Sequence, residues 1–455
     1  MAWQPTIDSA CTRADKIVLL ALASCATRDH QHRRDRPHYG QIGPEDSGYD
    51  SDPKSKLDDA SSAGEMAATD MVDEEAYRAA LDILAGMTDR KSLHFEPTIF
   101  TTWDNADIPI IPQVWLNAYV RWAQTIVRKP TDVVFVSHFL IYSTTVLPSA
   151  AWLLFGSFSY LHGILHLLYA IWCAGSFTLM MHNHLHQNGL LIRARPWSVV
   201  DRLFPYVLYP LMGHTWNSYY YHHKQMHHVE GNGPSDLSST IFYQRDAFFD
   251  FLCYLFRFLF LIWYQLPIYF WVRRRRSTAV KLMISEYSNY ALLGVAAWWN
   301  LKPAIFTLLL PCLILRIGLM VGNWGQHALV DEKDPVSDFR SSITLIDVAS
   351  NRFCFNDGYH TSHHLNPLRH WRDHPHHFLS KQHTYASQQA LTFHGIDFVM
   401  LTVQLLRKKY DYLADRLVPM GEQCSMSKAE IVQLLKRKTR RFEEGDIKRL
   451  FPKTA

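Results

Sequence analysis

Three absences limit what this chain of 455 residues can be. Its seven cysteines are scattered, their number is odd, and none pairs at a metal or redox spacing, which excludes a disulfide framework. The formal net charge of +4 is too small to favour nucleic acid as a partner. No internal repeat is visible, so a solenoid or an array is excluded as well.

Histidine is the residue that the chain has in excess: there are 25, many of them crowded into three short segments. The first cluster contains His182 and His186, four residues apart, so a helix would present both imidazoles on one face, close enough to share a metal. His184 lies between them and points away on a regular helix. We expect it either to stand outside the site or to support a ligand.

The second cluster repeats the four-residue spacing in His223 and His227, which again predicts one shared helix face. His228 follows one position later, rotated by about 100° on an α-helix, so it can address a neighbouring metal. As for His184, we expect His222 either to stand outside the site or to support a ligand. A dinuclear site requires ligands that diverge in this way.

The third cluster holds His360, His363 and His364, with the same helical spacings counted from His360. A fourth element, Asn323 with His327, places both side chains on one face at the end of an apolar stretch. So many buried imidazoles would leave unsatisfied polar groups unless a metal bound them. They exceed the ligands of a single zinc, so the sequence predicts two metals, with iron or zinc both open.

Long apolar runs accompany the clusters, and hydrophobic residues make up 48% of the chain. The runs 133–156 and 159–181 each reach the roughly 20 residues that a bilayer span needs. If all clusters share one site, the chain must cross the membrane an even number of times between the second and third clusters. Spans at about 287–300 and 304–322 satisfy this condition. The apolar run 248–272 is then predicted to be interfacial or re-entrant.

These features predict an all-α integral membrane protein with a cytosolic helical domain that holds a histidine-rich di-metal site. We expect four parts: a poorly ordered polar region over 1–75, amphipathic or interfacial helices over 76–130, a membrane domain over 131–395, and a cytosolic helical tail over 396–455.

In their order and combination, the motifs HxxxH, HxxxHH, NxxxH and HxxHH resemble those of the membrane fatty-acid desaturase and hydroxylase superfamily. The likeness covers about residues 115–380, and the context 357–367 around the third cluster adds to it. The resemblance implies four spans over a cytosolic di-iron site that uses O2. Nine ligands are implied: His182, His186, His223, His227, His228, His327, His360, His363 and His364.

The resemblance also implies that Asn323 acts through a bound water. From their positions in the clusters, we expect His184 and His222 to be further residues beside the ligands. A lipid acyl substrate and a multi-pass location in the endoplasmic reticulum follow from the same likeness. No His-Pro-Gly-Gly haem motif is present in the chain, so electrons are expected from a separate donor such as cytochrome b5. Three departures stand out. The first cluster has the extra His184, the second has three intervening residues where two are commoner, and the third begins with His360 rather than the Gln typical of front-end desaturases.

The expected reaction is O2-dependent desaturation of an acyl lipid or acyl-CoA. The alternative on the same scaffold is a hydroxylase or related oxidase of an acyl, alkane or sterol substrate. A third possibility is a non-redox membrane protein with histidine-bound zinc. We expect the acyl tunnel near Trp172, Phe177, Leu315 and Leu319.

Overall fold

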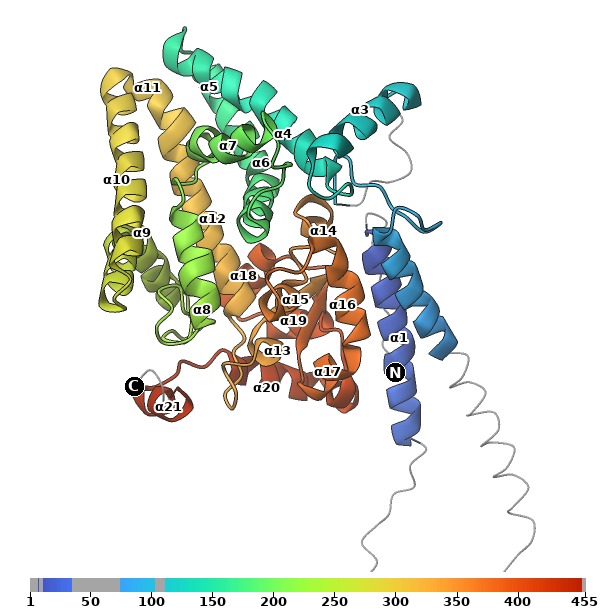
Figure 1. The fold of residues 1–455 in the computed structure, drawn as a ribbon. Helices are drawn as coiled ribbons and strands as arrows, with labels where there is room; N and C mark the ends of the chain where they lie inside the picture. Colours follow the sequence, from blue (N-terminus) through green and yellow to red (C-terminus); the bar gives the residue numbers. More distant parts are fainter. Residues whose placement is uncertain (1–6, 8–10, 35–73, 103–110, 452–455) are drawn as a thin grey trace, which may run out of the picture.

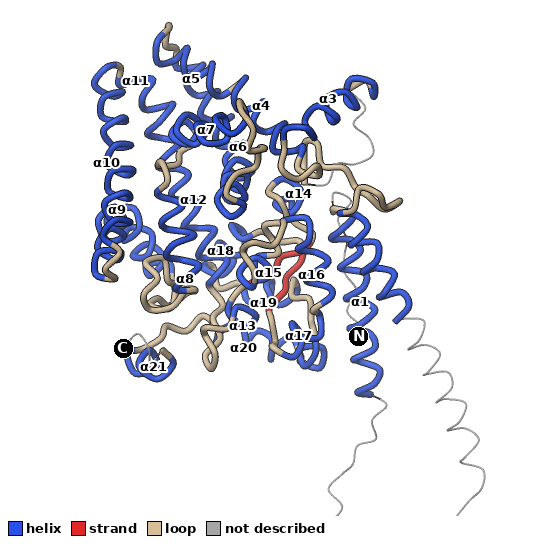
Figure 2. The backbone as a smooth tube through the Cα atoms, in the orientation of Figure 1, coloured by secondary structure: helices blue, strands red, loops and turns tan. Residues whose placement is uncertain are grey.

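The computed structural model describes residue 7 and residues 11–34, 74–102 and 111–451, and the fold is mostly helical, as predicted. Figure 1 shows two parts along the long axis of the molecule: a bundle of long helices and, beneath it, a domain of shorter helices. Figure 2 shows that a small sheet lies in this second part. We call them the helical bundle and the lower domain.

Within the described residues, four helical segments are long and apolar enough to cross a membrane. They are Val133–Phe155 (α4, Val133–Thr144, and α5, Val146–Phe155), Tyr160–Gln187 (α6), Phe248–Val272 (α9) and Leu301–His327 (α11, Leu301–Ala304; η2, Ile305–Leu309; α12, Leu310–His327). The Ser159 hydroxyl caps α6 by accepting from the His162 amide, and Asn188 ends the helix in the left-handed region. The predicted first hairpin is therefore present.

The contacts of α9 show that it lies differently in the bundle from the other three candidate spans. Near its start, the Tyr254 hydroxyl accepts from Asn323 Nδ2 at 2.6 Å, and near its end Tyr269 donates to Glu230. Both partners lie on the histidine side of the bundle, so α9 runs along that side. This arrangement fits the interfacial expectation, although length and composition alone group α9 with the spans.

The neighbouring helix α10 (Arg276–Trp299) runs through the depth of the bundle instead. It starts beside Arg275, which bonds Gln225 near the second cluster, and it leads into α11. There Lys302 lies 5.6 Å from the ring centre of Tyr160, at the opposite end of α6 from the histidines. The predicted span 304–322 lies inside the candidate span Leu301–His327, but α10 is not among the four candidate spans, so the predicted crossing at 287–300 is not supported by length and composition.

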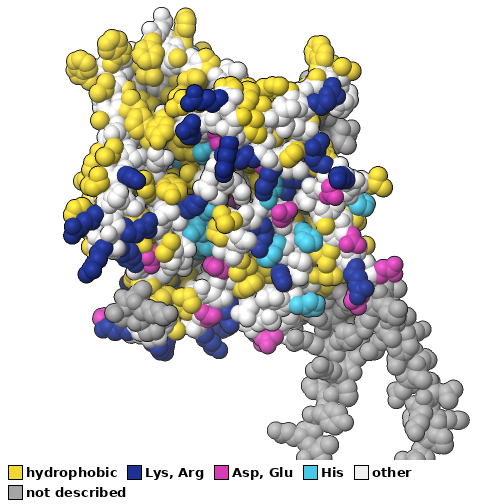
Figure 3. Space-filling view, viewed as in Figure 1, with side chains coloured by type: hydrophobic (Ala, Val, Ile, Leu, Met, Phe, Trp, Pro, Cys, Tyr) yellow, Lys and Arg dark blue, Asp and Glu magenta, His cyan; other side chains and the backbone are white. Residues whose placement is uncertain are grey.

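Figure 3 shows hydrophobic side chains gathered over the bundle around α5, α10 and α11, with Lys and Arg more numerous below them. Trp152, Phe155, Trp298 and Trp299 are among the exposed apolar side chains at that end. Surface this apolar is typical of contact with lipid rather than water.

The lower domain is built from short elements that follow the bundle in sequence. They are α13 (Asp338–Ser341), β1 (Ile343–Ile346), α14 (Ala349–Phe353), α15 (His360–Leu365), η3 (Trp371–Asp373), α16 (His374–Ser380), α17 (Gln382–Ser387), β2 (Leu391–His394), α18 (Phe398–Leu406), α19 (Tyr410–Asp415), η4 (Gly421–Ser425), α20 (Lys428–Lys438) and α21 (Glu444–Leu450). Strands β1 and β2 pair in parallel and are fully buried, a small exception to the all-α expectation.

Further helices pack beside the four segments. They are α3 (Gln113–Ile126), α7 (Trp197–Leu211), a π-helix η1 (Tyr220–His227) and α8 (His228–Glu230), with a further helix over 74–88. Of these, η1 packs on the end of α6, which brings the second histidine cluster next to the first.

The N-terminal region differs from the expectation of poor order over 1–75. Residues 35–73 lie outside the described part, but α1 (Arg13–Arg34) is a helix packed on the lower domain. Val18, Leu19 and Leu22 are buried in one core with Phe378. Burial of this apolar face stabilises the 22-residue helix. The average composition of residues 1–75 did not show this, because the polar stretch that follows the helix dominates it.

The C-terminal residues form short helices that are part of the core rather than an appended tail. Leu401, Leu405, Leu413 and Leu435 are fully buried together with residues of α9 and α12. Lys438 is also buried, and its ammonium donates to Asp331 at 2.9 Å. The lower domain therefore needs this segment to close its hydrophobic core.

Candidate metal centre

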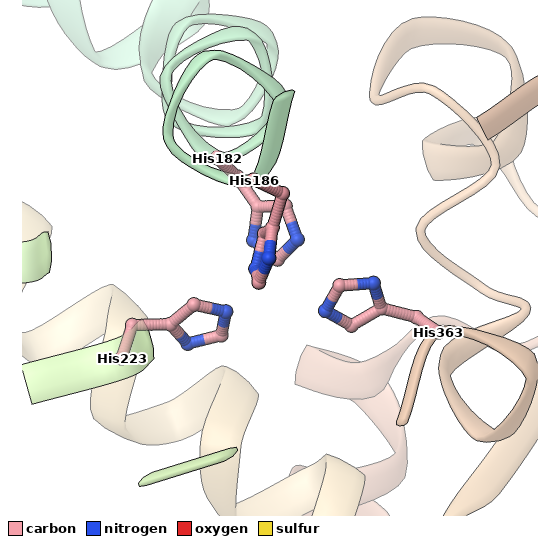
Figure 4. A group of neighbouring side chains, drawn as sticks. All are labelled: His182, His186, His223 and His363. Carbon is pink, nitrogen blue, oxygen red and sulfur yellow. The ribbon is translucent and has the colours of Figure 1, made fainter. Parts of the chain in front are cut away.

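Four of the predicted ligands face a common point, as Figure 4 shows. His182 and His186 come from the end of α6, His223 from η1 and His363 from α15. One ring nitrogen of each lies within 4.8 Å of one of every other. We call this set group one.

A second set, group two, consists of His227, His327 and His364, whose nitrogen atoms satisfy the same 4.8 Å limit. His327 ends α12, so a helix of the bundle contributes one imidazole to this group. The third cluster serves both groups, because His363 belongs to one and its neighbour His364 to the other.

The other two predicted ligands lie beside these groups. His228 Nε2 is 3.0 Å from the Nε2 atoms of both His223 and His363, and His360 Nε2 is 3.2 Å from that of His327. All nine predicted histidines therefore converge on one place between the bundle and the lower domain. Segments 145 residues apart in sequence meet there, counting from His182 to His327.

The second cluster departs from the predicted helix geometry. We expected His223 and His227 to share a face, but they belong to different groups, and His228 lies beside His223 instead. The reason is that η1 is a π-helix, whose wider turn brings residues five apart into line. The extra residue in this cluster is accommodated by that wider turn.

Burial keeps these imidazoles neutral. The pKa values of His223, His228, His360 and His363 are well below the usual range, first because burial removes water and then because neighbouring imidazoles repel a second charge. Neutral imidazole is the form that binds a metal.

Unpartnered nitrogen atoms support a metal site. Both ring nitrogens of His186 and Nε2 of His364 are buried with no hydrogen-bond partner among the described residues. Buried polar atoms of this kind are costly unless another group binds them. A set made only of imidazoles suits zinc, copper, iron or nickel, and the number of them suits two metals.

Two carboxylates that the sequence analysis missed contact imidazoles of group two. Asp236 Oδ2 is 2.7 Å from His227 Nδ1, and Asp338 Oδ1 is 3.3 Å from His364 Nδ1. Contact with His227, and hydrogen bonds from Ser238, hold the pKa of Asp236 below its usual range against the effect of burial. Such partners orient a metal-binding imidazole. The only sequence signal was the nearness of Asp236 to the second cluster.

The three further residues predicted beside the ligands lie in different settings. Asn323 donates to Tyr254 and to the Ser238 carbonyl at 3.1 Å, which leaves its amide oxygen for a water. His222 stacks parallel to His227 at 6.4 Å, and burial lowers its pKa to about 4. His184 instead contacts Asp201 and Phe204, on the other side of α6 from its neighbours in the cluster.

A cavity of about 20 Å³, room for one water, lies beside group one. Asp357 and His374 line it together with His182, His186 and His363. Burial raises the pKa of Asp357 to about 7 and lowers that of His374 to about 3. His374 also lies 2.9 Å from the Ser362 hydroxyl and was missed in the sequence, because it stands outside the spaced clusters.

Comparison with known proteins agrees with this geometry. The sequence model of the family described as fatty acid desaturase matches residues 156–396, more than half of the 455 residues. No significant match is found among curated proteins or among solved structures. The chain belongs to the fatty acid desaturase family.

Membership makes the chain an oxidoreductase of the desaturase and hydroxylase type. With its apolar helices, it is a multi-pass membrane protein whose clustered histidines could hold metal ions.

Proposed function

We propose that the chain desaturates a fatty acyl chain with O2 at a pair of irons held by the nine histidines. The observation that carries the proposal is the pairing of groups one and two around shared elements, inside a chain of the desaturase family. By proximity, His228 completes group one and His360 completes group two. The domain that does this chemistry corresponds to residues 131–395.

The metals would supply the oxidising power that removes hydrogen from an unactivated CH2 group. Overall, one O2, two hydrogen atoms of the acyl chain, two electrons and two protons give an alkene and two waters. The protein residues orient the ligands and exclude water. Asp236 fixes His227 through Nδ1, so that Nε2 faces the site.

The electrons would come from a separate cytochrome b5-type donor, on the side of the membrane where the lower domain lies. This side would be the cytosolic face of the endoplasmic reticulum. The Arg273–Arg276 run supports that orientation, because basic residues beside apolar helices favour the cytosolic side. Asn323 would hold a water near group two through its free amide oxygen.

Expression in a host with simple lipids, followed by lipid profiling, tests the proposal. We expect acyl products lighter by two hydrogens, and about two irons per purified chain. Products that gain an oxygen atom would show the hydroxylase outcome instead. Zinc without iron, and no new lipid, would contradict the proposed function.

A further inference from the structure

An apolar cavity of about 500 Å³ lies between α9, α10 and α12, among exposed apolar side chains of the bundle. We call it the lateral cavity. Phe260, Trp263 and Leu313 line it and are all more than one-third exposed, so it opens onto an apolar surface. Its volume lies within the range of small-molecule sites. A ligand that enters here arrives from the bilayer, because the surrounding surface faces lipid.

One wall of the lateral cavity is charged. Arg316 lines it, and its Nη2 lies 2.7 Å from Glu286 Oε1, with the two side chains 15% and 4% exposed. Tyr290, also in the wall, donates to the same carboxylate, and Ser218 donates to its other oxygen. An ion pair in a membrane bundle is costly and usually marks a functional site.

The arginine keeps donors for a ligand. Among the described residues, Glu286 hydrogen-bonds one end of the guanidinium, and the Tyr290 ring lies 5.6 Å from its centre. A guanidinium has five N–H donors, so others remain for an oxygen atom in the cavity. The Glu286 carboxylate, by contrast, already accepts from Arg316, Tyr290 and Ser218.

The charged wall is adjacent to the metal centre. Ser218 precedes Tyr219, whose ring stacks on His223 with centres 4.9 Å apart. Along α12, Arg316 lies seven residues before Asn323, about 10 Å at the rise of an α-helix. The predicted tunnel residue Trp172 is 85% exposed, which makes it unsuited to line an enclosed path.

Building on the proposed function, we propose that the lateral cavity binds the acyl chain of a membrane lipid, with an ester or amide oxygen bonded to Arg316. The substrate is thus an acyl lipid that reaches the metals from within the bilayer, not a water-soluble thioester.

A second cavity, of about 440 Å³ between α6 and α7, is the alternative entry for a phosphate-bearing thioester. Arg128, Arg193 and Arg202 line it. However, Arg128 pairs with Asp201 at 3.1 Å, and the cavity lies on the His184 side of α6, away from the nine histidines. The lateral cavity therefore has the better position relative to the metals.

The test uses the full metal-loaded chain in lipid nanodiscs that contain phosphatidylcholine with a diazirine in mid-chain. After illumination, we expect cross-links on peptides of α9, α10 or α12 that line the lateral cavity. Leu313→Trp or Leu309→Trp, which fill the cavity, should lower both cross-linking and turnover of the lipid by about tenfold or more. Ile314→Trp, an exposed neighbour outside the lining, is the matched control and should stay within about twofold.

Cross-links elsewhere, or equal ones in Leu313→Trp and Ile314→Trp, would overturn the proposal. The proposal would also be overturned if turnover of acyl-CoA fell in Arg202→Ala and was unchanged in Leu313→Trp. That result would leave the proposed function unaffected. Wild-type protein with full iron that oxidises neither substrate would refute the proposed function, while the cross-links would still report whether the cavity is occupied.

Discussion

Groups one and two consist of the same kind of side chain but have different surroundings. In group two, Asp236 and Asp338 contact the Nδ1 atoms of His227 and His364. In group one, His186 has no hydrogen-bond partner among the described residues, and the group borders a cavity with room for one water. A carboxylate makes an imidazole a stronger and better oriented ligand. We therefore expect group two to hold its metal more tightly, and group one to be the more accessible of the two.

Removing one ligand from each group tests this comparison most strongly. His363→Ala and His227→Ala should each abolish product, because one metal of the pair loses a ligand that nothing nearby replaces. We expect metal content to fall from about two towards about one per chain, measured by elemental analysis of purified protein. Retained activity in both variants would refute the ligand assignment.

Loss of a carboxylate should affect only group two. Asp236→Asn should weaken metal binding about 10- to 100-fold, since Asp236 is fully buried against His227. Asp338→Asn should have a smaller effect, because the Asp338 side chain is itself 35% exposed. Titration with a chelator measures both, and in wild-type protein it should remove one metal before the other. Simultaneous loss of both metals from wild-type protein would show that the two groups do not differ in strength.

Asp15 links α1 to the third histidine cluster, which contributes His363 to group one and His364 to group two. It accepts from Tyr359, the residue before His360, at 2.7 Å and from Asn351 at 3.0 Å, and burial raises its pKa to about 6. A raised carboxyl pKa means that the folded state binds more protons, so stability falls as pH rises from about 4 to about 6.

Replacement of this carboxyl by a neutral amide removes that pH dependence. The Tm of Asp15→Asn relative to wild type should therefore increase with pH and level off above about pH 6, as measured by thermal unfolding. The Tyr359→Phe variant shows how much of the change comes from the hydrogen bond itself. A Tm difference that is independent of pH would contradict the assignment.

The smallest effect is expected at His184, which stands between two ligands yet contacts Asp201. His184→Ala should keep both metals and most activity, whereas His186→Ala, two residues away, should lose metal from group one. Elemental analysis of the two variants compares them directly. Loss of metal in His184→Ala would show that the pair of ligands in the first cluster was chosen wrongly.

Local spacing in the sequence was sufficient to predict that the nine histidines lie close together, the first apolar hairpin and the mostly helical fold. The four-residue spacing of His182 and His186 needs only helix geometry, and the long runs around them need only bilayer thickness. The same reasoning failed at η1, because a π-helix cannot be recognised from the order of histidines alone. It also missed Asp236 and the core made by α1 and the C-terminal helices.

Which histidines lie within reach of one another was decided by the tertiary structure. Residues 182, 223 and 363 come from three separate elements, and only their packing assigns them to group one and His227 to group two. The lateral cavity likewise depends on three helices meeting. Sequence patterns report neighbours along one element, whereas a site between elements depends on how those elements pack in space.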